Sequence, residues 1–407
     1  MNPISGRRLV LAAAAVGLVA RLAFGFLYWV HKPLTHDERE YLALAQSLTA
    51  GHGFTYDPAY ESGTTQQFGR APAYPVFLAA IGGGKGNYDA APARVKVAQS
   101  LVGAAGVWLI GLLAWRLAGA KAAAAAAWIA AIYPPLVWIA AYVLSEALYC
   151  TIALGTVLLL DRAVDRRDAR QPSSSRSAAA GALCGLAILI RPAMLFFVPL
   201  AVLWLIVRRH FTIAAVLVAT ALLVVAPWSV RNYRTYGRFV LVASEGGVTF
   251  WTGNHPLARG EGDLAANPDI KIAELEFRAG HPGLTAEQLE PLYYREAVGY
   301  IASHPAWWAG LLARKLFYTV VPIGPSYTLH STLYAASSIA SYLLLVPFAI
   351  AGARAYRRRR GAPETLFLLA ASAVIVCVLF FPQERFRIPV IDPTLIVCAG
   401  LFAADRS

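Results

Sequence analysis

The sequence predicts an all-α polytopic membrane protein, with about ten transmembrane helices and two long outer loops that carry interfacial helices. Composition is the first of three reasons. Hydrophobic residues make up 58% of the 407 residues and charged residues only 14%, against roughly 45–50% and about 25% in soluble domains. This excludes an ordinary soluble enzyme, a disordered chain and a fibrous protein. The apolar segments and the placement of positive charge are the other reasons, and residues 1–407 are expected to form a single membrane domain.

The apolar segments are the expected membrane helices, because about 20 apolar residues cross the hydrocarbon core of a bilayer. The first segment is long enough to span and is followed by no clean small-residue cleavage site, so we expect a retained helix rather than a signal peptide. The segments lie at roughly 9–30, 94–115, 122–140, 143–160, 178–190, 192–207, 211–227, 333–353, 362–381 and 388–404.

The positive charges orient these helices, because Lys and Arg concentrate in short cytoplasmic loops. With the N-terminus in the cytoplasm, the short outer loops hold only Arg191, Arg385 and Arg387. The cytoplasmic segments then hold Arg7, Arg8, Arg116, Lys121, Arg162, Arg166, Arg167, Arg170, Arg176, Arg208, Arg209, Arg354, Arg357–Arg360 and Arg406. This pattern predicts an inner (plasma) membrane protein with both termini cytoplasmic. It assigns the net charge of +13 to membrane topology and lipids, and no nucleic-acid partner is expected.

Two long polar stretches, 31–93 and 228–332, fall outside the membrane and precede the C-terminal helices in 333–407. Segment 306–322 could span, but spanning would move Arg357–Arg360 to the outer side, so we expect an interfacial helix.

The cysteines and histidines predict no metal centre. Cys150, Cys184, Cys377 and Cys398 lie in apolar stretches without a CxxC pair, and we expect buried hydrophobic side chains. No phosphate-binding glycine loop is present. Most acidic residues lie in the outer segments, so catalysis should face outward. An activated substrate would have to arrive there attached to a lipid.

The first outer loop carries Thr35-His36-Asp37-Glu38-Arg39-Glu40-Tyr41 at the start of an expected helix. Asp37 and Tyr41 are four residues apart and share one helix face, so Tyr41 is a candidate for substrate binding. Asp37 and Glu38 are catalytic candidates, as a general base or a cation ligand. Thr35 and Glu38 also form a capping-box pattern, which would leave Asp37 free to act.

Further candidates for substrate binding lie near the ends of apolar segments. Arg70, in a Pro-rich turn, could hold a lipid phosphate or simply extend to the interface. Glu146, at the outer end of the fourth helix, is either functional or a helix-start carboxylate near water. Arg191, before Pro192, could bind substrate or anchor a kink at the interface.

The second outer loop and the last outer turn add five candidates. Arg231 could bind phosphate, and Trp251 with Asn254 could bind a sugar face and its hydroxyls, or all three could belong to a turn-rich scaffold. Arg385 and Arg387 stand on the side that positive charges avoid. They therefore need an anionic partner, such as a lipid phosphate or an outer-loop acid like Glu384.

These motifs together resemble the C-type glycosyltransferase superfamily. The matching stretches are Asp37–Tyr41, Gly51–Phe54, Tyr74–Ala79, Ser145-Glu146, Arg191-Pro192, Pro227–Asn254 and Arg385–Pro389. The nearest branch is the bacterial one similar to protein O-mannosyltransferases and lipid A aminoarabinose transferase. The resemblance implies a polyprenyl-phosphate-linked sugar donor and transfer to a protein, lipid or glycan acceptor outside the cytoplasm.

The resemblance also implies residue roles. Asp37 would be the catalytic carboxylate, while Arg70, Arg385 and Arg387 would contact the donor phosphate during direct displacement with inversion. A divalent cation at Asp37 stays open, although His36 and His52 make no recognised ligand spacing. A flippase for lipid-linked sugars is the competing class. Transporters place polar groups near the bilayer midplane, whereas these candidates cluster at the outer helix ends.

Overall fold

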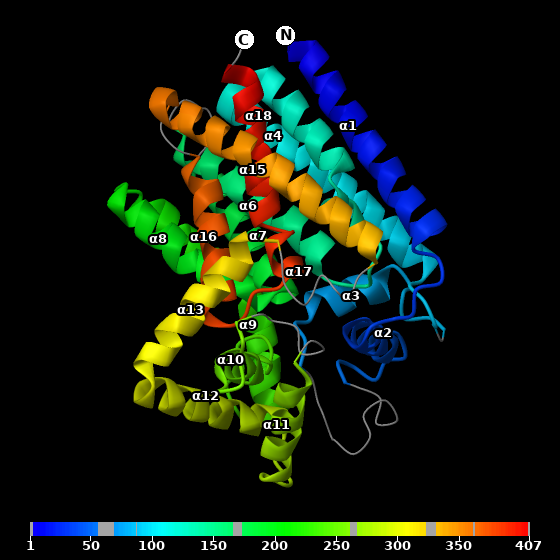
Figure 1. Cartoon of the computed structure of the whole chain (residues 1–407), viewed down its shortest axis with the longest axis vertical. Coiled ribbons are helices and arrows are strands. Elements are labelled where there is room, and N and C mark those ends of the chain that lie inside the picture. The colour runs from blue at the N-terminus through cyan, green and yellow to red at the C-terminus, as the bar shows by residue number, and fades with distance from the viewer. Residues whose placement is uncertain are drawn as a thin grey trace.

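The computed structural model describes residues 3–55, 69–86, 88–165, 173–260, 267–322, 331–360 and 363–405. Within these ranges the chain forms helices and one isolated antiparallel bridge between Pro33 and Ala90, with no strand. A bundle of long helices carries a group of shorter helices at one end (Figure 1). The predicted all-α class is confirmed.

The helices of the bundle coincide with the predicted apolar segments. They are α1 (Pro3–Ala23) with its π-helical continuation η1 (Phe24–Tyr28), α4 (Ala93–Ile132), α5 (Pro134–Trp138), α6 (Glu146–Val164), α7 (Ser173–Ile190), the 3₁₀ turn η3 (Pro192–Phe196), α8 (Phe197–Val207), α9 (Phe211–Tyr236), α15 (Thr332–Arg360), α16 (Glu364–Leu379) and α18 (Ile391–Asp405). Among the described residues, five helical stretches are long and apolar enough to cross a membrane, and four are shorter apolar helices. The chain is therefore a multi-pass membrane protein, while the number ten stays a prediction.

Helix α4 covers the predicted segment 94–115 and the part of the predicted segment 122–140 up to Ile132. Ala118 and Gly119 leave the helical conformation between its two halves, with Gly119 at φ +80°. This left-handed conformation is open to glycine at little steric cost. The expected cytoplasmic loop is therefore reduced to a tight turn between two helices, whose halves pack against each other, as Gly111 beside Ala127 shows.

Small residues allow the bundle helices to pack closely. Helix α1 packs on α4, α18 packs on both α4 and α15, and α7 packs on α9. A side chain on Gly400 of α18 would meet the backbone of Ala122 on α4. Such small-residue contacts drive helix association in membranes, where the hydrophobic effect between helices is absent. All four cysteines are free and buried, as predicted.

The shorter helices lie at the end of the bundle opposite the start of α1 and the end of α18 (Figure 1). They are α2 (His36–Thr49), α3 (Ala73–Ala80), α10 (Gly246–Asn254), α11 (Pro268–Ala279), α12 (Ala286–Ser303) and α13 (Pro305–Val320). The last of these is the predicted interfacial segment. At 16 residues α13 has the same length as α16, which coincides with a predicted membrane segment, so its place at the interface stays a prediction. Arg166, Arg167, Arg170 and Arg406, used to orient the chain, lie outside the described residues.

Candidate active site

The start of α2 is fixed by the capping box that the sequence predicts. Oε2 of Glu38 accepts hydrogen bonds from the backbone N and Oγ1 of Thr35, at 2.8 and 2.9 Å, and the Glu38 backbone N donates back to Thr35. Oε1 of Glu38 accepts a further bond of 2.8 Å from the backbone N of Val143. Both carboxylate oxygens are therefore used to hold the helix in place.

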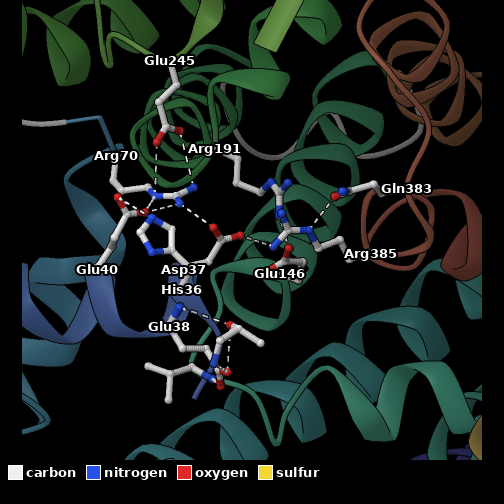
Figure 2. A network of polar contacts seen from close by, with 12 residues as sticks. His36, Asp37, Glu38, Glu40, Arg70, Glu146, Arg191, Glu245, Gln383 and Arg385 are labelled. Atoms are coloured by element: carbon white, nitrogen blue, oxygen red, sulfur yellow. Dashed lines mark hydrogen bonds and ion pairs between the residues drawn. The ribbon is translucent and has the colours of Figure 1, made fainter. Parts of the chain in front are cut away.

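Residues 139–145, between α5 and α6, form an irregular but buried segment. Backbone polar groups buried in protein need partners, and two side chains supply them here. Nε2 of Gln99 donates to the carbonyls of Ala140 and Tyr142, while Glu38 accepts from Val143. Through these bonds α2 is attached to the membrane bundle, and Glu38 turns away from Asp37 (Figure 2).

Three guanidinium groups, those of Arg70, Arg191 and Arg385, gather around Asp37 and are called the arginine cluster here (Figure 2). Oδ1 of Asp37 accepts from Nη2 of Arg70 at 2.6 Å, and Oδ2 accepts from Nη1 of Arg385 at 2.5 Å. Burial alone would raise the pKa of Asp37, but the charges of Arg385 and Arg70 outweigh it and hold that pKa far below its usual range. Residues distant in the sequence thus meet at one carboxylate.

Arg70 binds two further carboxylates that the sequence analysis did not select. Its guanidinium donates to Glu40, and its Nε lies 3.2 Å from Oε1 of Glu245. It also lies 5.2 Å from the ring centre of Tyr41, which shares the Asp37 face of α2 as predicted. A side chain on Gly69 would stand 2.8 Å from the same Glu245 oxygen. Glycine at position 69 therefore leaves room for this carboxylate.

Arg191 and Glu146 form an ion pair beside Arg385. Nη1 of Arg191 lies 2.5 Å from Oε1 of Glu146, the first residue of α6. Pro192 ends α7, because the residue before a proline avoids the helical conformation, and Arg191 is extended there. The guanidinium carbons of Arg191 and Arg385 lie 4.9 and 5.6 Å from the ring centre of Phe386. One ring thus holds both cations close together.

Arg385 and Arg387 have different environments, although the sequence treats them alike. Both lie in the single turn α17 (Glu384–Arg387), where residues two apart do not share a face. Nε of Arg387 lies 3.0 Å from the buried Asp392, and its guanidinium stacks 4.1 Å from the ring centre of Tyr342. Only Arg385 joins the arginine cluster, so the predicted phosphate contact of Arg387 has no geometric support.

Arg231 lies outside the arginine cluster as well. Its guanidinium donates to the backbone carbonyl of Phe54 at 3.3 Å and to the hydroxyl of Tyr236 at 2.9 Å. It also lies 4.9 Å from the ring centre of Trp228. These contacts join the two outer loops to each other, as the scaffold alternative expects.

Trp251 and Asn254 are buried in the packing of the outer helices. Trp251 is 2% exposed and packs against His255, Phe277 and Tyr293, so its ring faces are not open to a sugar. Oδ1 of Asn254 accepts from Trp308 and from the buried ammonium of Lys315. The polar atoms expected to bind sugar hydroxyls are used inside the fold.

A metal ligand set is not apparent in the part of the chain that the structure describes, where no three His, Cys, Asp or Glu side chains gather suitably. His36 is largely exposed and lies 3.6 Å from Glu40. The cation at Asp37 stays a prediction. The chemistry of the described cluster is that of guanidinium groups able to bind phosphate, arranged around a carboxylate able to orient a hydroxyl.

The chain has the fold of an archaeal oligosaccharyltransferase, described below, which agrees with the resemblance of its motifs to the C-type glycosyltransferase superfamily. Residues 89–230, about a third of the chain, match the family model described as dolichyl-phosphate-mannose-protein mannosyltransferase. Among curated proteins, none matches the sequence.

Solved structures are similar to this chain at low sequence identity, and the fold is shown by the two with the higher TM-scores. Archaeal oligosaccharyltransferase AglB from Archaeoglobus fulgidus, in complex with an inhibitory peptide and a dolichol-phosphate, aligns over 97% of this chain and 50% of its own, with 16% identity and a TM-score of 0.58. The apo form of the Archaeoglobus fulgidus oligosaccharyltransferase aligns over 98% and 50%, with 18% identity and the same TM-score. ArnT from Cupriavidus metallidurans bound to undecaprenyl phosphate aligns over 98% and 78%, with 16% identity and a TM-score of 0.47. The chain thus spans about half the length of the oligosaccharyltransferase chains that it matches.

Proposed function

We propose that this protein is a glycosyltransferase that moves a sugar from a polyprenyl-phosphate donor to an acceptor on the outer face of the membrane. The observation that carries the proposal is Asp37 held between Arg70 and Arg385. It joins a carboxylate that can orient a nucleophile to cations that can hold a phosphate. The fold and the family match support the same class of reaction.

The donor phosphate is assigned to Arg385 and Arg191. Arg385 follows α16 and Arg191 follows α7, so both cations stand at the ends of apolar helices. A lipid phosphate lies at this depth, with its chain among the helices and its charge near water. The dolichol-phosphate bound to the archaeal oligosaccharyltransferase supports a lipid-linked donor.

The reaction is written as a direct displacement with inversion. The acceptor oxygen forms a bond to the anomeric carbon of the sugar, and the bond from that carbon to the phosphate oxygen breaks. The electron pair stays on the phosphate, where guanidinium groups stabilise the developing charge. Asp37 orients or deprotonates the acceptor. Because its oxygens accept from Arg70 and Arg385, a phosphate that takes over Arg385 would free Oδ2 for this contact.

A transfer assay tests the proposal. The protein in lipid vesicles is mixed with a panel of undecaprenyl-phosphate-linked hexoses, pentoses and amino sugars and with a membrane extract containing protein, lipid and glycan acceptors. Mass spectrometry then follows the loss of each donor and any sugar mass gained by an acceptor. We expect one donor to be consumed with a matching adduct. Movement of intact donors between leaflets without consumption would contradict the proposal and favour a flippase.

A further inference from the structure

The arginine cluster has two chemically different ends (Figure 2). At the basic end, Arg191 is ion-paired with Glu146 and Arg385 with Asp37. At the acidic end, Arg70 alone faces Glu40 and Glu245 as well as Asp37. A phosphate would be repelled by the acidic end, whereas a neutral hydroxyl that must lose a proton is suited to it.

Glu245 differs from the other carboxylates at the acidic end in origin and in access. It comes from the second outer loop, immediately before α10, while Asp37 and Glu40 both belong to α2. Its side chain is 38% exposed, against 22% for Asp37 and 10% for Glu40. Among these three carboxylates, it is therefore the one that an incoming acceptor reaches most easily.

The position of Glu245 is fixed by the packing around α10. The carboxylate of Glu290 on α12 accepts from the backbone N of Gly247, at 3.3 Å. Side chains on Gly69, Gly247 or Gly253 would each come within 3.0 Å of a neighbouring atom. The contacts of Gly247 with Glu290 and of Gly253 with Phe380 hold α10 in place, and Gly69 in the first outer loop leaves room for the Glu245 carboxylate beside Arg70.

We propose that Glu245 is the proton acceptor of the transfer reaction, while Asp37 orients the nucleophile and positions the arginines. This rests on the proposed function. In the step, the acceptor O–H bond breaks and its proton passes to a carboxylate oxygen of Glu245. The freed electron pair forms the bond to the anomeric carbon, and the bond to phosphate breaks, leaving its electrons on the phosphate at the basic end. The products are glycosylated acceptor, polyprenyl phosphate and protonated Glu245.

The electrostatic environment supports this division of roles. Both oxygens of Asp37 bind arginines, and the resulting low pKa makes it a weak base. Although part of the Glu245 side chain is exposed, desolvation of its carboxylate beside Arg70 raises its pKa to about 7. Arg70 and Arg385 oppose the rise, while Glu40 and Asp37 add to it. The carboxylate of Glu290, across α10, contacts Gly247. A base whose pKa lies near the working pH combines availability with strength.

The test compares Glu245→Gln with Glu40→Gln, because both residues bind Arg70 but only one is proposed to take the proton. With the donor that wild type consumes, kcat is measured from pH 5.5 to 9, and undecaprenyl phosphate affinity is measured in parallel. In wild type, kcat should rise with pH and level off above about 7, as Glu245 loses its proton. Glu245→Gln should lower kcat by about 100-fold or more, remove that rise and leave the affinity for undecaprenyl phosphate unchanged.

Glu40→Gln should keep the rise, whatever its effect on the absolute rate. Two results would overturn the assignment: a Glu245→Gln enzyme that keeps the wild-type pH profile, or two variants with the same altered profile, because Glu245 would then act only by holding Arg70. Retained affinity for undecaprenyl phosphate shows that the variant is folded. Failure of wild type to consume any donor would instead contradict the proposed function itself.

Discussion

At the scale of single residues, the ion pairs around Asp37 indicate which residues take part in the transfer reaction and which only stabilise the fold. Replacing Asp37 with Asn removes the charge that holds both Arg70 and Arg385. We expect Asp37→Asn to lower the transfer rate by about 100-fold or more, with normal membrane insertion and elution in gel filtration. The matched control is Asp269→Asn, an exposed outer-loop acid. More than about a tenth of wild-type activity in Asp37→Asn would contradict a central role.

Donor binding gives a second prediction at this scale. A hydrogen bond to a charged group contributes about 1.5–3 kcal/mol, and each 1.4 kcal/mol is about tenfold in affinity. Arg385→Ala should therefore weaken undecaprenyl phosphate binding by about 10- to 100-fold, as measured by titration calorimetry. Arg238→Ala, at an exposed outer-loop arginine, is the control. Equal affinities in the two variants would place the phosphate elsewhere.

Much of the candidate site could be predicted from residue type and from the side of the membrane on which each residue was expected. Asp37, Arg70, Glu146, Arg191 and Arg385 stand out as charges beside apolar segments, and the structure brings them together. The sequence could not separate Arg385 from Arg387, because the single turn that directs them apart is too short to show periodicity.

The same limit explains the residues that were misplaced or missed. Trp251 and Asn254 are polar or aromatic residues in a glycine-rich loop, and only the packing of α12 and α13 shows that they are buried. Glu245 lay in a motif without being selected. Its partner Arg70 is 175 residues away, and no local pattern indicates such a pairing.

At the scale of elements, the start of α2 decides where Asp37 lies. Glu38 accepts hydrogen bonds at both oxygens, and a glutamine can accept at only one. Glu38→Gln should therefore lower the free energy of unfolding by about 1–3 kcal/mol, seen as a lower melting temperature in detergent. Glu276→Gln on the exposed face of α11 is the control. Unchanged stability with full loss of transfer would make Glu38 a catalytic residue, as the sequence analysis first suggested.

The helices themselves were predictable because apolar length determines them, and each predicted segment lies for the most part in helical structure. The exceptions have local physical causes. The left-handed conformation of Gly119 allows the two halves of α4 to be joined by a tight turn in place of the expected loop. Residues 139–140 and 143–145 fall within predicted helical segments, but they are irregular, and Gln99 and Glu38 satisfy backbone groups there. The backbone conformation of that segment depends on hydrogen bonds to side chains of other helices, and hydropathy carries no information about such bonds.

At the scale of the whole molecule, membrane orientation is the property on which an outward-facing site depends. The four native cysteines are buried, so introduced cysteines should dominate labelling by a membrane-impermeant maleimide. We expect Lys271→Cys, on α11, to react in intact cells and Arg209→Cys, between α8 and α9, to react only after permeabilisation. The reverse pattern would place the arginine cluster in the cytoplasm and contradict the proposed donor and acceptor.

The binding of a lipid phosphate by the arginine cluster is the central claim, and a structure of the full chain with undecaprenyl phosphate in a lipid nanodisc tests it most directly. The account predicts phosphate oxygens within hydrogen-bonding distance, about 3 Å, of the Arg385 and Arg191 guanidinium groups. It also predicts that the ion pair between Asp37 and Arg385, which is 2.5 Å long without the lipid, is broken. A phosphate bound elsewhere, with that ion pair intact, would contradict it.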